Sequence, residues 1–461
     1  MSFSFSARAG TVGDLTREWG TREAVDLYLD RCQVDTPNRL VESVWRRLGQ
    51  SRKNIGKVVD FGAGDGRFAL AGRYKLYIGY EIDPSRVGGL NLPRNARVIH
   101  RCAFADIIND ADVCVGNPPY VRNQDLPEGW RQSAAEVIRQ RIGVRVSGLA
   151  NAWQYFTFLS LASTKHDGLV SLVIPYEWVS RPSALSLRAY IESKGWGVAV
   201  YRLRDSTFNR VLTTSSITVI DKRVQSREWQ YFHEVADGCF QELQSPTGAS
   251  KSVLRYVRRA ALRDHELEVK RGLSPGTQEV LTLTEDERKQ SGLKIGTDVA
   301  RCITSLRPFQ PSIRKLSEYA FLKHVRDAGH KCWLVRTDQE PSSRLRAYLD
   351  RVPQRKRETA TCKTRRPWWR FVMPTVPSII VASGFRGSKP KIVLNDLRVR
   401  AVGGLTGVYG LSPSQSKAFI EYFRSQSLKG RIVAHSHGFR KLEVGQLMSL
   451  LTTWLRGLNR R

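Results

Sequence analysis

Four short apolar segments in the first quarter of the chain each run into a polar turn, and this repeated pattern constrains the fold most strongly. The segments cover residues 57–61, 76–80, 96–100 and 112–116. Glycine, proline and polar residues separate them, which is typical of buried strands that alternate with helices. The pattern predicts a mostly parallel α/β sheet, and in such sheets ligands bind at the carboxyl ends of the strands.

A glycine-rich turn follows the first predicted strand. Gly62, Gly64 and Gly66 come just after Asp60, and glycines at a strand end let the backbone approach a ligand closely. The spacing is not the Gly-x-Gly-x-x-Gly of dinucleotide-binding proteins, and no Gly-Lys-Ser/Thr of a P-loop follows. The turn therefore indicates a ligand site of neither class.

Acidic residues also follow the next two predicted strands. Glu81 lies about 20 residues past the first turn, where a ribose diol is usually held. Asp106 follows the third strand at the start of a loop. One such carboxylate is more often a helix cap or a solvated turn, but the ordered set of Asp60, Glu81 and Asp106 favours a ligand site.

The fourth predicted strand ends in Asn117-Pro118-Pro119-Tyr120. Two adjacent prolines fix two φ angles and remove two N–H donors, so the nearby carbonyls are left free as acceptors. The Asn117 oxygen and the Pro118 carbonyl could accept both N–H bonds of a planar amino group, with Tyr120 stacked on its face. Asn and Pro also occur in ordinary turns, so it is the preceding carboxylates that favour a site.

These motifs in this order resemble the amino-group DNA methyltransferases that use S-adenosylmethionine. They are most similar to adenine-N6 enzymes of restriction–modification systems, in which the target recognition domain comes last. The resemblance covers residues 31–222 and includes Thr-Pro at 36–37, Ala-Asp-Ile at 105–107 and Phe208 before a further strand. It implies a Rossmann-like, mostly parallel, seven-stranded methyltransferase sheet and site-specific methylation of a flipped adenine in double-stranded DNA.

The resemblance also implies a role for each motif residue. Thr36 and Asp60 would lie near the methionine end of the cofactor, Glu81 at the ribose, Asp106 at the cofactor's adenine, and Ile82 with Tyr120 as apolar walls. The implied catalytic residues are Asn117, Pro118, Pro119 and Tyr120. The implied stacking residues for the target base are Tyr120 and Phe208, and the implied cofactor-binding residues are Thr36, Asp60, Gly62, Gly64, Glu81, Ile82, Asp106 and Asn117.

Two residues of the glycine turn depart from this family pattern. Asp65 and Arg67 stand where many relatives carry small residues, so the methionine end would be held differently. No Pro-Cys nucleophile motif is visible, which argues against methylation of a cytosine ring carbon.

The positive charge is concentrated in the C-terminal part. The whole chain of 461 residues has a net charge of +31, and residues 251–461 hold 42 Lys+Arg against 17 Asp+Glu. Such an excess indicates a polyanionic partner. We expect a catalytic S-adenosylmethionine-binding domain over 1–237, a linker over 238–251 that is rich in Pro, Gly and polar residues, and a basic mixed α/β DNA-recognition domain over 252–461.

Two stretches of this basic part are candidates for phosphate contacts. Residues 351–370 combine many cations with Trp368 and Trp369, which we expect in the core. In residues 430–442, His435 and His437 lack a third ligand, so no metal site is predicted. The candidate DNA-binding residues are Arg355, Lys356, Arg357, Arg365, Arg366 and Arg440.

Other functions fit parts of this pattern. The same turn occurs in methyltransferases that act on RNA guanine or protein glutamine, and a non-catalytic DNA-binding protein could retain the fold. A nicotinamide dehydrogenase fits the region of Asp60 and Glu81 but not the proline turn. The expected partners are double-stranded DNA and a separately encoded restriction endonuclease. With no apolar run long enough for a bilayer and no leader pattern, we expect a cytoplasmic monomer that does not bind membranes.

Overall fold

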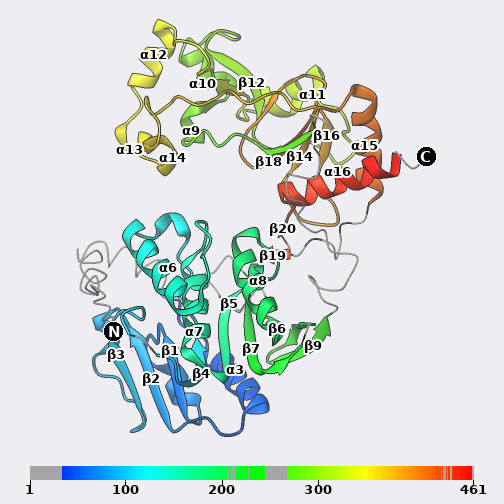
Figure 1. Ribbon diagram of the computed structural model, residues 1–461. Helices are drawn as coiled ribbons and strands as arrows, with labels where there is room; N and C mark the ends of the chain where they lie inside the picture. The colour runs from blue at the N-terminus through cyan, green and yellow to red at the C-terminus, as the bar shows by residue number, and fades with distance from the viewer. Residues whose placement is uncertain are drawn as a thin grey trace, which may run out of the picture. The chain divides into compact units, whose positions relative to one another are not determined.

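The computed structural model describes residues 34–106, 108–204, 207–208, 214–226, 228–243, 267–426, 428, 432, 434–436 and 439–458. The chain divides into two compact units (Figure 1). Unit 1 comprises residues 1–251 with 435–437, and unit 2 comprises 252–434 with 438–461. The structure does not describe residues 1–33, at the start of the expected catalytic domain, or residues 244–266. The latter include most of the expected linker and the start of the expected recognition domain.

Unit 1 is built on one nine-stranded sheet with the strand order β3-β2-β1-β4-β5-β7-β6-β8-β9. Most neighbouring strands are parallel, and the antiparallel pairs are β5–β7, β6–β7 and β8–β9. The strands are β1 (Lys57–Phe61), β2 (Leu76–Glu81), β3 (Ala96–His100), β4 (Ala111–Gly116), β5 (Thr164–Pro175), β6 (Trp196–Arg202), β7 (Ser215–Gln225), β8 (Gln230–Ala236) and β9 (Cys239–Leu243). The predicted mostly parallel α/β sheet is confirmed.

Helices pack on both faces of this sheet, and successive side chains of β4 point to opposite faces and contact both helical layers. Val113 and Val115 share a core cluster with α3, whereas Cys114 on the opposite face contacts Ser160 of α7. Figure 1 shows α6 and α7 beside the strands. The helical segments are α3 (Asn38–Ser51), α4 (Arg67–Ala71), α5 (Pro84–Val87), η1 (Asn123–Asp125), α6 (Glu128–Ile142), α7 (Ala152–Ser163), η2 (Tyr176–Val179), η3 (Pro182–Ala184) and α8 (Leu185–Lys194).

The parallel register brings the predicted motifs to one edge of the sheet. Phe61 pairs with Tyr80, and Val59 pairs with Cys114, so β1, β2 and β4 end close together. The turns after these three strands therefore meet, as expected from the sequence.

The prediction of seven strands was wrong because β8 and β9 extend the sheet beyond β6. The sequences of these two strands contain many polar residues, so they lack the apolar pattern that predicts a buried strand. Gly238, which we interpreted as the start of a linker, has φ +71° and forms the hairpin turn between them. Residues 239–243 therefore belong to the sheet. The added edge is covered by aromatic contacts, in which Phe232 stacks on Tyr201 with ring centroids 4.6 Å apart.

Unit 2 is a mixed α/β unit with two four-stranded sheets, ordered β10-β18-β14-β16 and β11-β13-β12-β17. In addition, β15 pairs with β20. Its strands are β10 (Glu268–Arg271), β11 (Thr282–Leu283), β12 (Val299–Ile303), β13 (Trp333–Val335), β14 (Ile379–Ala382), β15 (Gly384–Phe385), β16 (Ile392–Leu394), β17 (Arg400–Ala401), β18 (Leu405–Tyr409) and β20 (Phe439–Lys441), and β19 covers Ala434–Ser436. Its helices are α9 (Gln278–Leu281), α10 (Glu285–Gln290), α11 (Glu318–Phe321), the π-helical η5 (Leu322–Arg326), α12 (Ser343–Asp350), α13 (Gln354–Arg357), α14 (Ala360–Lys363), α15 (Pro413–Ser425) and α16 (Val444–Leu458).

Strand β14 separates two hydrophobic clusters in unit 2. Ile380 packs into one cluster, and its neighbours Ile379 and Val381 pack into the other, which also holds the apolar faces of α15 and α16. Trp369 is buried in the first cluster and Trp368 packs against it, so the prediction that these tryptophans belong to the core is confirmed. Among the described residues, no helix is long and apolar enough to cross a membrane.

Candidate active site

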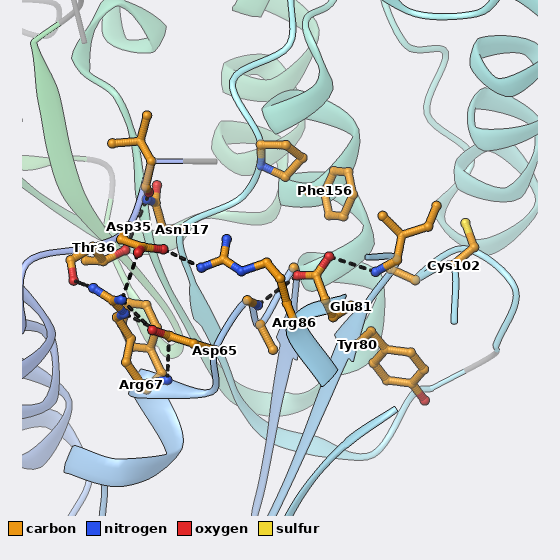
Figure 2. Close-up of a pocket in the computed structure, with 18 of the residues that line it drawn as sticks. Asp35, Thr36, Asp65, Arg67, Tyr80, Glu81, Arg86, Cys102, Asn117 and Phe156 are labelled. Atoms are coloured by element: carbon orange, nitrogen blue, oxygen red, sulfur yellow. Dashed lines mark hydrogen bonds and ion pairs between the residues drawn. The ribbon is translucent and has the colours of Figure 1, made fainter. Parts of the chain in front are cut away.

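An open pocket in unit 1 lies where the turns after β1, β2 and β4 meet the segment before α3, and its empty space is about 970 Å3. Figure 2 shows Asp35, Thr36, Arg67 and Asn117 at one end of it. Phe156 and Cys102 lie at the other end, with Arg86 and Glu81 between the two groups. The pocket thus has a charged end and an apolar end.

The glycine turn forms one wall of this pocket. Gly62, Gly64 and Gly66 all have positive φ angles, of +98°, +57° and +73°, which side chains rarely allow. The Gly62 N–H donates to the carbonyl oxygen of Tyr80 at 2.8 Å, which fixes the turn against the end of β2. The prediction that these glycines shape the turn after β1 is confirmed.

Glu81 lies on the pocket wall, where its carboxylate organises the surrounding backbone. Oε2 accepts from the Gly64 N–H at 2.8 Å, while Oε1 accepts from the N–H groups of Ile82 and Asp83 at 2.8 and 2.9 Å. Since each carboxylate oxygen has two lone pairs, one acceptor position remains on Oε2 for a hydroxyl group in the pocket. Ile82 also lines the pocket.

A chain of alternating charges lines the other end of the pocket. Arg67 donates to Asp65, with Nε 2.8 Å from Oδ1, and its guanidinium also lies 3.2 Å from a carboxylate oxygen of Asp35. Asp35 pairs in turn with Arg86. The hydrogen bond from Arg67 lowers the pKa of Asp65. Asp65 and Arg67 are the residues that depart from the family pattern, and the sequence did not indicate Asp35 and Arg86 as their partners.

Thr36 lies just before α3 and does not cap that helix. Helix α3 begins after Pro37 with no side-chain cap, and the buried Thr36 hydroxyl instead accepts from Nδ2 of Asn117 at 3.1 Å. The same Nδ2 lies 3.4 Å from the Val34 carbonyl oxygen. The Asn117 amide is therefore held from its nitrogen side.

The oxygen side of Asn117 is left open. Within the described part of the chain, its buried Oδ1 has no hydrogen-bond partner. A buried acceptor without a partner costs about 1–3 kcal/mol, so it indicates a donor that arrives with a ligand. Asn117 and Pro119 line the pocket, while Pro118 is buried behind them.

Tyr120 is fixed by the strands below the turn. Its hydroxyl donates to the Val173 carbonyl oxygen at 2.9 Å and lies 3.3 Å from Oγ of Ser215. Burial raises the pKa of this hydroxyl. The ring thus has one orientation relative to β5 and β7.

Asp60 is fully buried beneath the turn after β4. One oxygen accepts from the Tyr77 hydroxyl at 2.7 Å, and Oδ1 has no partner within the described residues. Burial raises the pKa of Asp60 to about 7, although the Tyr77 hydrogen bond acts in the opposite direction. Asp60 does not line the pocket itself, so it supports the turns from below.

Tyr120 lies outside the pocket lining, and so do the predicted site residues Asp106 and Phe208. Asp106 pairs with Arg101 at 3.0 Å and hydrogen-bonds Tyr80, whose pKa is raised to about 12 by burial and by this contact. Phe208 is buried in the core cluster that contains β7, so stacking on a target base remains a prediction for it. The sequence missed the pocket residues Cys102, Trp130 and Phe156, which come from loops and helices without a motif.

The cations proposed for DNA contact are mostly engaged within unit 2. Lys356 pairs with Glu279 at 2.5 Å, and Arg357 and Arg365 donate to backbone carbonyl oxygens, each at 2.6 Å. Arg366 and Arg440 also donate to backbone carbonyls, at 3.0 Å each, whereas Arg355 is exposed with no side-chain partner among the described residues. These cations stabilise loops, and their DNA contacts remain predictions.

Comparison with known proteins supports the resemblance seen in the motifs. Residues 95–197 match the Eco57I restriction-modification methylase family. Type II methyltransferase M.XamI of Xanthomonas campestris pv. amaranthicola is 26% identical over 200 residues, which cover 40% of this chain and 38% of that protein. The chain thus spans about two fifths of that curated relative. The expected resemblance to restriction–modification methyltransferases is confirmed.

Two solved structures are similar to parts of this chain. The methyltransferase subunit of a type I restriction-modification system from Streptococcus thermophilus has a TM-score of 0.39 at 16% identity, covering 45% of this chain and 50% of that one. The type IIG restriction endonuclease BpuSI has a TM-score of 0.43 at 12% identity, covering 90% of this chain and 58% of that one.

Proposed function

We propose that this chain, which matches restriction–modification methylases over residues 95–197, transfers a methyl group from S-adenosylmethionine to the N6 amino group of an adenine in double-stranded DNA. The observation that carries the proposal is Asn117, whose Nδ2 is held by Thr36 while its Oδ1 is buried and unpartnered. An adenine amino group has the donors that such an oxygen requires. The Pro118 carbonyl would accept the second N–H.

The pocket chemistry fits S-adenosylmethionine along its whole length. The apolar end with Ile82 and Phe156 suits the adenine ring, and the free acceptor position on Glu81 suits a ribose hydroxyl. The charged end suits an amino acid group, which carries both an ammonium and a carboxylate. When bound, this cofactor supplies an electrophilic methyl group.

The residues of the chain would position and activate the acceptor nitrogen. The adenine must leave the base stack, at a cost of about a few kcal/mol, before it can reach the pocket. Hydrogen bonds from the amino group to Asn117 and Pro118 would leave its lone pair available, and Tyr120 would support the ring face. Much of the remaining rate enhancement would come from holding the nitrogen in line with the methyl group.

The basic unit 2 is proposed as the DNA-recognition domain, with a separately encoded restriction endonuclease as a functional partner. Its cations would contact phosphates and help offset the energy needed to flip the base. We further propose that the protein acts as a cytoplasmic monomer.

The direct test is an incubation of plasmid DNA with the protein and methyl-labelled S-adenosylmethionine, followed by nucleoside analysis. We expect N6-methyladenine in one sequence context. Label that appears only in RNA, in protein glutamine or in cytosine would contradict the proposed substrate.

The Asn117→Ala variant tests the site itself. We expect turnover to fall at least about 100-fold, because the acceptor for the amino group is lost, while S-adenosylhomocysteine binding measured by calorimetry stays within about twofold. Thr36→Val should lower kcat by a smaller factor, since the Asn117 amide loses one anchor, and Thr36→Ser should retain activity. Asn91→Ala, at an exposed position, is the control. Full methylation by Asn117→Ala would overturn the assignment.

A further inference from the structure

Unit 2 contains a large basic hollow, and within its lining Phe439 and Lys441 belong to a stretch that the sequence indicated for phosphate contacts. Its empty space is about 2650 Å3, and it lies between the loop after β12, the loop between β15 and β16, and the ends of β10, α15 and β20. The described lining contains no Asp or Glu. It contains seven cations, namely Arg271, Arg307, Arg386, Lys389, Lys391, Arg424 and Lys441.

Three of these cations hold the walls of the hollow together. Lys391 donates to the backbone oxygens of Arg307, at 2.8 Å, and of Phe309, and burial lowers its pKa. Arg424 donates to the Pro311 carbonyl oxygen at 3.0 Å, and Lys389 donates to the carbonyl oxygen of Arg424. The loops that line the hollow are thus linked to one another and to α15.

Three other cations have no side-chain partner among the described residues. Arg271, Arg307 and Arg386 are exposed, and within the described residues their side chains make no hydrogen bond or ion pair. Uncompensated like charges in one hollow repel one another, so the arrangement favours a polyanion that neutralises them. The remaining cation, Lys441, is paired with Glu443 at 2.9 Å.

The loop of residues 386–391 combines this positive charge with open space, into which the backbone of a polyanion could fit. Gly387 has φ +80°, and no atom lies within 4 Å of the position where its side chain would begin. Arg440 donates to the Gly387 carbonyl oxygen at 3.0 Å and so fixes the loop. Ser388 is exposed beside it and can donate to a phosphate oxygen.

We infer that this hollow is the groove in which unit 2 grips duplex DNA, with Arg271, Arg307 and Arg386 contacting phosphates. The inference deepens the proposed DNA methylation and rests on it for the choice of DNA as the polyanion. It moves the phosphate contacts away from residues 351–370, where several cations are already bound to carbonyl oxygens and to Glu279.

A charge-matched pair of triple variants tests this assignment. The groove variant is Arg271→Gln/Arg307→Gln/Arg386→Gln, and the control is Arg351→Gln/Arg355→Gln/Lys363→Gln, whose exposed side chains likewise have no partner among the described residues. Binding of a fluorescein-labelled duplex of mixed sequence is followed by anisotropy over a series of KCl concentrations, without cofactor.

We expect the groove variant to bind roughly 10- to 100-fold more weakly, with a slope of log K against log salt that is shallower by about two to three, because three phosphate contacts are lost. The control should change affinity and slope much less. Ser388→Glu, which adds a negative charge and removes the exposed hydroxyl donor, should also weaken binding. Equal losses in both triple variants, or no loss in the groove variant, would overturn the inference, as would tighter binding of an RNA of the same length.

Two parallel measurements separate this inference from the proposed function. Unchanged S-adenosylhomocysteine binding and an unchanged Tm show that the variants are folded. If the unmodified protein binds duplex through the groove but never methylates it, the proposed function fails and the groove stands. If it methylates DNA and the groove variant does so equally well, the groove assignment fails alone.

Discussion

At the scale of single residues, the site depends on polar atoms that are buried without partners. Oδ1 of Asn117 and Oδ1 of Asp60 are both in this state within the described residues. They differ in their role, because Asn117 lines the pocket and Asp60 lies beneath it. Asn117 can therefore receive a ligand donor directly, whereas Asp60 responds to its burial by binding a proton more tightly.

The raised pKa of Asp60 predicts a specific dependence of stability on pH. The ordinary pKa of an aspartate is 3.8, and that of Asp60 in the folded chain is about 7, so the folded state holds a proton that the unfolded chain releases between about pH 4 and 7. The stabilisation from Asp60 is complete below pH 4 and is lost as the pH rises through 7. Asp60→Asn keeps an oxygen for the Tyr77 hydroxyl but cannot titrate.

The test compares the free energies of unfolding of Asp60→Asn and of the unmodified protein. We expect their difference, variant minus unmodified, to increase by about 1–3 kcal/mol between pH 5 and pH 8, because only the unmodified protein loses stability over this range. Urea denaturation at several pH values measures this difference, in which other titrating groups cancel. Tyr77→Phe removes a hydrogen bond that lowers the pKa of Asp60, so the loss of stability should extend to higher pH. A difference that does not vary with pH would contradict this account.

The sequence predicted which residues lie at the site better than it predicted their contacts. Asn117, Glu81 and the glycines are found at the pocket because they follow strands that end at one edge. The contact between Thr36 and Asn117 joins residues 81 positions apart. Pairings of this kind, like that of Asp35 with Arg86, follow from the folded backbone and have no local sequence signal.

At the scale of elements, β4 must pass very close to β1 where it delivers Asn117. Gly116 has φ +147°, and a side-chain carbon placed there would lie 2.2 Å from Oδ1 of Asp60. Only glycine fits this position without moving the buried carboxyl group. The end of β4 and the turn that follows it therefore depend on this close approach.

Gly116→Ala should consequently lower the free energy of unfolding by about 2–4 kcal/mol, since it combines backbone strain with a clash against a buried group. Thermal and urea denaturation measure the change. The matched control is Gly49→Ala in α3, where the added carbon has no neighbour within 4 Å and should be neutral or stabilising by up to about 1 kcal/mol. Similar stability of both variants would show that the close approach of β4 to β1 does not exclude a side chain at position 116.

The elements of unit 1 were predictable where their pattern is local and apolar. Residues 57–61, 76–80 and 96–100 form strands as expected, and helix α3 presents Leu40, Val44 and Leu48 to the core at helical spacing. The β8–β9 hairpin was missed because its burial comes from cross-strand aromatic contacts. In unit 2, β10 pairs with β18, where Glu268 lies opposite Tyr409, and such distant pairing cannot be read from neighbouring residues.

At the scale of the whole molecule, the distribution of charge predicted a region for a polyanion, but it did not identify the free cations. In the sequence, Arg365, which donates to the Pro275 carbonyl oxygen, cannot be told apart from Arg386, which has no side-chain partner among the described residues. What distinguishes them is the contact made after folding. The net charge of unit 2 is therefore a poor guide to which individual cations are available for the proposed DNA contacts.

The alternating charges of Asp65, Arg67, Asp35 and Arg86 imply that salt concentration affects the two binding steps of the proposed enzyme differently. The amino acid group of the cofactor carries one positive and one negative charge. When it binds among these four side chains, its charges pair with theirs, the total charge of the site does not change, and few counterions are released. We expect the Kd for S-adenosylhomocysteine to change by less than about threefold between low and moderate KCl, whereas DNA affinity should fall steeply over the same range. Calorimetry and anisotropy on the same preparation measure both, and a steep salt dependence of cofactor binding would contradict this. Salt would then act as a selective control, under which the protein retains its methyl donor while it releases and samples DNA.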